Sequence, residues 1–91
     1  MKRVEIIANK SVEEDIMEAL AASGVAKHYT LIPVVHGSGR QGRRTGETVW
    51  PEENFDLVVY CEEEEERAIA GAVAKVKEHF PHEGIKLVSI G

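Results

Sequence analysis

Every second residue from Val4 to Ala8 is apolar, so one face of residues 2–9 is hydrophobic. This period of two predicts a β-strand. The residues that follow have the apolar spacing of a helix. Ser11 and Glu14 are three residues apart, as in a capping box, which predicts that the helix begins at Ser11. The helix carries an apolar stripe and ends at a well-placed glycine: Val12, Ile16, Ala19, Leu20 and Gly24.

Two more strands flank the longest stretch that has no hydrophobic period. Residues 27–35 predict a strand, and Pro33 predicts that it lies at a sheet edge because proline has no amide hydrogen for a ladder. Residues 55–61 are apolar on both faces, which is typical of a central strand. The stretch between them, Val35 to Asn54, is far longer than a hairpin turn, and such loops are usually functional or disordered.

The second helix is predicted over residues 62–80, followed by a last strand over residues 85–90. Acidic residues crowd the first turns of this helix and basic residues the last, as the helix dipole favours. We interpret the run from Glu62 to Glu66 as a solvated helix start, with binding of a metal or another ligand as the alternative.

The order strand, helix, strand, strand, helix, strand predicts an α+β chain with the ferredoxin-like βαββαβ arrangement, as a single domain over residues 1–91. Its four-stranded antiparallel sheet has both helices on one face, and the first and third strands are central. We expect the other face to expose an apolar patch, so that the sheets of a homo-oligomer pack face to face. The residues expected in the patch are Ile7, Leu31, Val58, Tyr60 and Val88.

The charge, the cysteine count and the hydropathy of the chain exclude several classes of protein. A net charge of -5 on 91 residues argues against a nucleic-acid-coating protein, so no nucleic-acid partner is expected. The lone Cys61 excludes an internal disulfide and fits a reducing, cytoplasmic location. No apolar stretch is long enough for membrane insertion. No nucleophile stands with an evident base, so an enzyme is not expected.

The seven residues 35–41, with the sequence VHGSGRQ, lie between the second and third predicted strands. In this position they resemble the start of the T-loop of PII signal-transduction proteins, and the opening MKRVEII resembles the first strand of that family. The resemblance implies a homotrimeric, non-enzymatic sensor of nitrogen-regulation type. Such proteins bind ATP, ADP or AMP in clefts between subunits and contact a protein target, such as a transporter, enzyme or regulator, through the loop, here residues 36–54.

Carried over by position, Gly37, Gly39, Arg40 and Gln41 would line the phosphate side of the cleft, with His36 at its border. The chemistry suits a small anionic ligand, because glycines let backbone amides approach an anion and an arginine adds a fork of charged donors.

Other residues extend or depart from the family pattern. Where the family has a glycine-rich loop with a phosphate-binding lysine, this chain has one glycine, Gly84, before the last strand. Lys86 is the candidate substitute for that lysine. Within the long loop, Arg43, Arg44 and Trp50 are the candidate contacts with a protein target, since tryptophan and arginine often anchor interfaces.

Two alternatives belong to other classes. A metal-binding trimer related in fold to CutA-type proteins would use His36, His79 and His82 as ligands. An oligomeric scaffold would bind no ligand at all.

Overall fold

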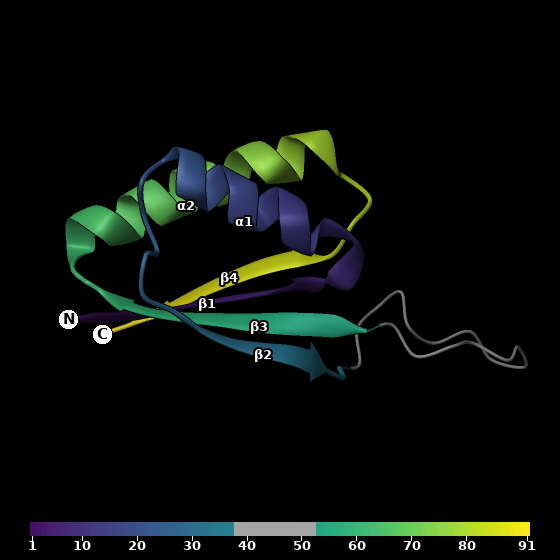
Figure 1. The fold of residues 1–91 in the computed structure, drawn as a ribbon, viewed down its shortest axis with the longest axis horizontal. Coiled ribbons are helices and arrows are strands. Elements are labelled where there is room, and N and C mark those ends of the chain that lie inside the picture. The colour runs from purple at the N-terminus through teal and green to yellow at the C-terminus, as the bar shows by residue number, and fades with distance from the viewer. Residues whose placement is uncertain (38–52) are drawn as a thin grey trace, which may run out of the picture.

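The computed structural model describes residues 1–37 and 53–91, and in this part of the chain the predicted order of elements is confirmed (Figure 1). Both helices lie on the same face of the sheet, as the ferredoxin-like prediction requires. The elements are β1 (Lys2–Asn9), a 3₁₀ turn η1 (Lys10–Val12), α1 (Glu13–Ala22), β2 (Thr30–Val35), β3 (Asn54–Cys61), α2 (Glu63–His79) and β4 (Ile85–Ile90).

The strands form one antiparallel sheet in the order β2-β3-β1-β4. The predicted central positions of β1 and β3 and the edge position of β2 are therefore confirmed. A bulge interrupts β2 near its proline. Ile32 pairs with Asp56 and Val35 pairs with Asn54, so between these two pairs β2 contains one residue more than β3. Proline is confined to such edges and bulges because it cannot donate to the ladder.

The strand β2 begins at Thr30 and not at residue 27. In the connection that joins α1 to β2, Ala26 adopts a φ of 55°, a left-handed conformation outside the β region. Its amide is held by a side chain of α2, as described below. The predicted strand start was thus wrong by three residues.

The capping box predicted at Ser11 and Glu14 is also wrong. The side chain of Asn9 accepts a hydrogen bond from the Ser11 amide at 2.9 Å, so the turn is capped two residues earlier, at the end of β1. A single 3₁₀ turn follows, and α1 begins only at Glu13 without a side-chain cap.

The core lies between the helices and the covered face of the sheet. Phe55, the largest side chain in it, is fully buried. The core residues include Val4, Ile6, Ala8, Val12, Ile16, Leu20, Phe55, Leu57, Val59, Ile69, Ala72, Val73 and Val76. None of the helices in residues 1–37 and 53–91 is long and apolar enough to cross a membrane.

Strand pairing decides which side chains point away from the helices, because residues that pair across a sheet share a face. We call this helix-free side the open face. Two predictions about it are wrong. Leu31 pairs with Leu57 and packs against the core, so it belongs to the covered face. Val58 lies on the open face but is only 7% exposed, so it is not part of an exposed patch in the single chain. The open face carries Arg3, Glu5, Ile7, Thr30, Ile32, Asp56, Val58, Tyr60, Lys86, Val88 and Ile90.

Candidate functional site

The end of the sheet that carries the candidate ligand motif is tied together by backbone hydrogen bonds. The Lys10 amide donates to the Glu53 carbonyl at 3.0 Å, and the Asn9 amide donates to the Gly84 carbonyl at 3.3 Å. These bonds connect the entry to β3, the end of β1 and the start of β4. His36 and Gly37 leave β2 at this same end. The scaffold beneath the candidate motif is therefore fixed on both sides.

Of the predicted ligand-binding residues, only His36, Gly37 and Lys86 fall within the described residues. Gly39, Arg40, Gln41, Arg43, Arg44 and Trp50 lie outside them. His36 and Gly37 are exposed, and apart from its two chain neighbours no atom of residues 1–37 and 53–91 lies within 4 Å of where a Cβ on Gly37 would be.

Lys86 is exposed on the open face of β4, opposite Ile7. His36 follows β2, which is the other edge of the sheet. Three strand spacings of about 4.8 Å separate these edges, or roughly 14 Å. A single chain does not bring His36 and Lys86 together.

The histidines proposed as metal ligands are likewise separated. His79 and His82 flank the turn before β4, whereas His36 follows β2 at the opposite edge. Nδ1 of His79 lies at hydrogen-bond distance, 3.0 Å, from the Lys75 carbonyl oxygen. Among residues 1–37 and 53–91, no group of three or more His, Cys, Asp or Glu side chains could hold a metal ion. The CutA-like alternative gains no support.

A hollow of about 210 Å³ lies at the other end of the sheet, where the α1–β2 connection meets the end of β3 and the start of α2. The connection is held in place by the Ala26 amide, which donates to Oε2 of Glu65 at 2.9 Å. No sequence motif indicates this hollow, because its lining comes from three separated segments. The lining residues are Gly24, Lys27, His28, Tyr60 and Glu65.

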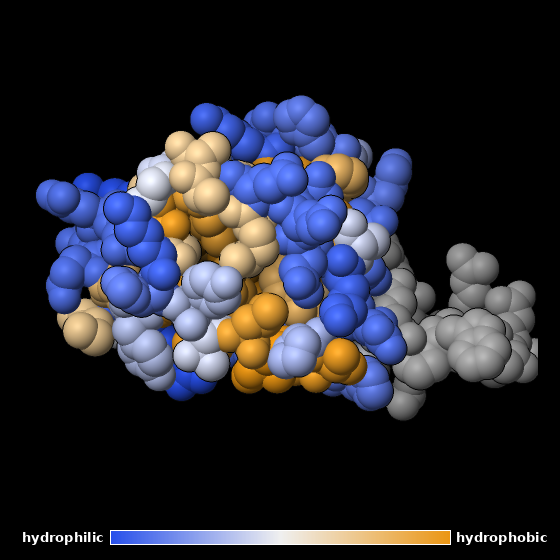
Figure 2. Space-filling model, in the orientation of Figure 1, coloured by the Kyte–Doolittle hydropathy of each residue, from blue (hydrophilic) through white to orange (hydrophobic). Residues whose placement is uncertain are grey.

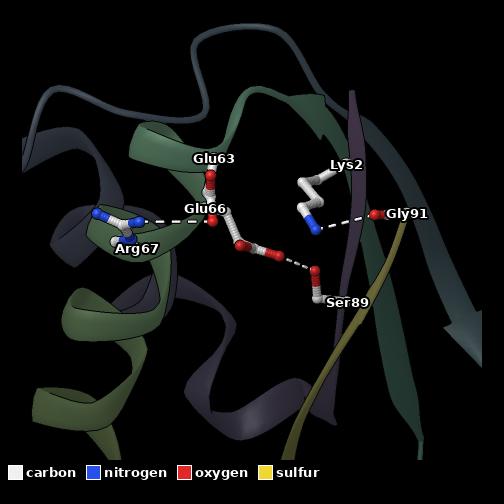
Figure 3. Close-up of polar contacts among 6 residues, drawn as sticks. All are labelled: Lys2, Glu63, Glu66, Arg67, Ser89 and Gly91. Atoms are coloured by element: carbon white, nitrogen blue, oxygen red, sulfur yellow. Dashed lines mark hydrogen bonds and ion pairs between the residues drawn. The ribbon is translucent and has the colours of Figure 1, made fainter.

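The acidic run at the start of α2 ties together the segments around it (Figure 3). Glu66 accepts a hydrogen bond from the Ser89 hydroxyl of β4, and Glu63 pairs with Arg67 at 3.4 Å. Lys2 joins the same corner by donating to the Gly91 carbonyl at 2.8 Å. The interpretation as a merely solvated helix start is therefore incomplete, since Glu65 and Glu66 connect α2 to the rest of the fold.

Charged side chains meet in the middle of the open face. Arg3 Nε lies 3.2 Å from a carboxylate oxygen of Glu5, and its guanidinium carbon lies 6.0 Å from the centre of the Tyr60 ring. The side chain of Asp56 is 9% exposed. Burial, followed by hydrogen bonding to Glu5 and its negative charge, raises the pKa of Asp56 to about 6, against a smaller lowering by Arg3.

Cys61, at the end of β3, is buried in the core. Burial, and then the negative charges of Glu65, Glu66 and Glu62, raise the pKa of its thiol. The thiolate is the reactive form of cysteine, so these surroundings favour an inert side chain. Cys61 is therefore part of the packed core.

Figure 2 shows hydrophobic surface over β2, the strand that carries the exposed Ile32 and Val34. Exposed apolar residues also lie at the far edge of the open face, where Ile90 of β4 is 57% exposed. Single exposed apolar residues are ordinary, but a face that carries several of them together usually marks an interface.

Comparisons with known proteins agree with this fold. A search among curated proteins finds no match. Among solved structures, CPII from Thiomonas intermedia, described as bound to ADP and bicarbonate, is 21% identical with a TM-score of 0.66, over 98% of this chain and 84% of that one. CPII in a second structure, described as a nitrogen regulatory PII-like protein bound to ADP, AMP and bicarbonate, is 18% identical with a TM-score of 0.62, over 99% and 91%.

A PII-like signaling protein from Thermus thermophilus is 23% identical with a TM-score of 0.61, over 98% of this chain and 83% of that one. At these identities the likeness is one of fold. The family model described as nitrogen regulatory protein P-II matches residues 1–87, which is nearly the whole chain and includes the motif at residues 35–41. The chain therefore belongs to the nitrogen regulatory protein P-II family.

Proposed function

We propose that this protein is a non-enzymatic, cytoplasmic regulator that binds an adenine nucleotide between the subunits of a homotrimer and signals to a protein target through residues 36–54. The observation that carries the proposal is the family match over residues 1–87, which includes the whole glycine- and arginine-containing motif. The ligand would be ATP, ADP or AMP, with Gly37, Gly39, Arg40 and Gln41 contacting its phosphates.

The size of the hollow supports a site shared between chains. Pockets that hold small molecules usually measure about 300–1,000 Å³. The hollow beside Tyr60 measures about 210 Å³, which is too small to enclose a whole nucleotide. A neighbouring chain that covered it would complete its wall.

The placement of the two candidate regions supports the same conclusion. The hollow lies where β3 ends, whereas His36 and Gly37 lie where β3 begins. The strand β3 has eight residues, so its two ends are seven steps of about 3.3 Å apart, or roughly 23 Å. One small ligand can contact both regions only if they come from different chains. Tyr60 would then offer its ring to the base, while the motif of the next chain binds the phosphates.

The descriptions of the relatives suggest which ligands to test. CPII is described as bound to ADP and bicarbonate in one structure and to ADP, AMP and bicarbonate in another. Both kinds of ligand are anions of the sort that backbone amides and an arginine bind. We therefore extend the proposed ligands to bicarbonate, bound together with the nucleotide.

Signalling to a protein target rests on the loop. Arg43, Arg44 and Trp50 supply side chains that commonly anchor protein interfaces. Trp50 is also the only tryptophan of the chain, so its fluorescence reports on the loop alone. We expect its emission to shift when the nucleotide binds.

Calorimetric titration with ATP, ADP and AMP, each with and without bicarbonate, tests the proposal. Arg40→Ala should weaken nucleotide binding at least tenfold, because it removes a charged donor worth about 1.5–3 kcal/mol. Arg67→Ala is the matched control, since Arg67 lies on the exposed side of α2 and contacts Glu63. The control should bind like the wild type. Absence of heat with all three nucleotides would overturn the nucleotide claim, and equal losses in both variants would remove Arg40 from the site.

A further inference from the structure

The carboxyl groups of Glu5 and Asp56 stand on neighbouring strands of the open face. Glu5 pairs with Val58 and Asp56 pairs with Ile7, so the two acids are diagonal neighbours across β1 and β3. Diagonal side chains on a sheet are within reach when they are long. The sheet therefore places two like charges next to each other at its centre, where repulsion would be greatest if both were ionised.

The surroundings of the pair are largely apolar. Asp56 pairs across the sheet with Ile7 on one side and Ile32 on the other, and Glu5 pairs with Val58 and Val88. The Oδ1 atom of Asp56 is buried and has no hydrogen-bond partner within the described residues. A buried carboxylate oxygen without a donor is costly, and protonating one member of the pair supplies a donor.

The other charged groups on this face offset the charge of Asp56 only in part, since Arg3 lowers its pKa by less than burial and Glu5 raise it. Arg3 of β1 is engaged with Glu5 and lies over the Tyr60 ring of β3. Lys86 of β4 is separated from Asp56 by Ile7, and it is exposed. The described residues of β2 that adjoin the pair, Thr30 and Ile32, are uncharged.

We propose that Glu5 and Asp56 share one proton when a second copy of this chain covers the open face, so that assembly of the protein takes up protons and weakens as the pH rises. The proposal rests on the homo-oligomer of the proposed function and adds to it a pH-sensitive regulation. A neighbouring chain would remove water from a pair that already lacks a donor, and a shared proton avoids burying two negative charges. The Tyr60 side chain belongs both to this face and to the hollow, so the same proton would influence the proposed ligand site.

The direction follows from the raised pKa of Asp56, about 6 against 3.8 for an ordinary aspartate. In the free chain this carboxyl loses its proton as the pH rises through about 6. Covering the face removes more water and raises the pKa further, so the assembled form holds the proton above pH 6. Assembly is then insensitive to pH well below 6 and loses strength above it.

Analytical ultracentrifugation of the full chain from pH 5 to pH 9 tests this. The dissociation constant of the wild-type assembly, counted per chain, should be at least tenfold higher at pH 8 than at pH 6. Because each chain takes up one proton, this constant can rise by at most tenfold for each pH unit. Asp56→Asn and Glu5→Gln each replace an acid by an uncharged group that can donate, so each should remove most of the dependence. Two variants are used so that poor folding of one does not decide the result. Glu14→Gln, on the exposed side of α1, is the matched control and should keep the wild-type pH profile.

The outcomes separate this proposal from the proposed function. A wild-type assembly of constant strength from pH 6 to pH 8 would overturn the shared proton and leave the oligomer intact. Assembly that weakens towards acid would also overturn it, because that result indicates a cation of the neighbouring chain paired with ionised Asp56. A single chain at every pH would overturn both.

Discussion

Two adjacent rows of side chains, one on each face of the same sheet, differ sharply in chemistry. On the covered face, cross-strand pairing aligns Leu31, Leu57, Ile6 and Leu87. On the open face, the next row aligns Ile32, Asp56, Ile7 and Lys86. The first row is apolar throughout, whereas the second alternates apolar and charged residues.

The difference teaches what each face packs against. Helices place hydrocarbon stripes on the covered face, so an unbroken apolar row is the stable solution. A sheet face that is fully exposed to water seldom carries isoleucines at its centre. A face that is buried only by apolar contacts seldom carries an aspartate. The mixture on the open face is typical of protein interfaces, whose apolar centres also carry specific polar pairs. We therefore regard the covered face as the basis of folding and the open face as the surface for the proposed assembly.

The largest effect is expected from the covered face. Phe55→Ala removes a fully buried side chain and should lower the free energy of unfolding by about 3–5 kcal/mol, or prevent folding. Tyr60→Ala, on the open face of the same strand, removes a ring that is 58% exposed and should cost about 1 kcal/mol or less. Chemical denaturation at one protomer concentration measures both. Equal losses would abolish the distinction between the faces.

A smaller but more specific effect is expected from the open face. Ile32→Glu places a charge where Ile32 is 41% exposed and adjoins Asp56, so it should weaken assembly tenfold or more while the chain stays folded. Ala74→Glu adds the same charge to the exposed side of α2 and should leave assembly unchanged. Light scattering distinguishes the assembly from the 10.1 kDa chain. If the two variants assemble equally well, another surface mediates contact.

The smallest effect concerns the corner where the hollow lies. Glu65→Ala removes the acceptor of the Ala26 amide and should lower the free energy of unfolding by about 1–2 kcal/mol. Amide hydrogen exchange in residues 24–29 should rise as well. Glu64→Ala is the control from the same helical turn, because Glu64 is exposed. A loss of stability in the control as large as that in Glu65→Ala would indicate an effect of the helix dipole, not of the hydrogen bond.

The candidate site was predictable only in part. The motif at residues 35–41 is contiguous, so the sequence was sufficient to single it out and to suggest the family that the comparison confirmed. The hollow was not predictable, because Gly24, Tyr60 and Glu65 come from separate segments, and each alone has an ordinary structural explanation. Its nearest signal in the sequence was the run of glutamates at the start of α2.

The sequence by itself determined the type and order of the elements, since the periods of two and 3.6 are local and strong. It also determined that β2 lies at an edge, because Pro33 has no amide hydrogen to donate to a neighbouring strand. Alternation shows which residues share a face of a strand but not which face the helices cover. Only the pairing of Leu31 with Leu57 decided that Leu31 faces the helices and packs against the core.

The tertiary structure also decided how the helices begin and what their acids contact. Asn9 replaced Ser11 as the cap because the end of β1 fixes where the chain must turn. The bond between Ala26 and Glu65 joins residues 39 positions apart, and the bond between Ser89 and Glu66 joins residues 23 apart. Contacts at such separations exist only after the strands and helices have packed, so no local pattern encodes them.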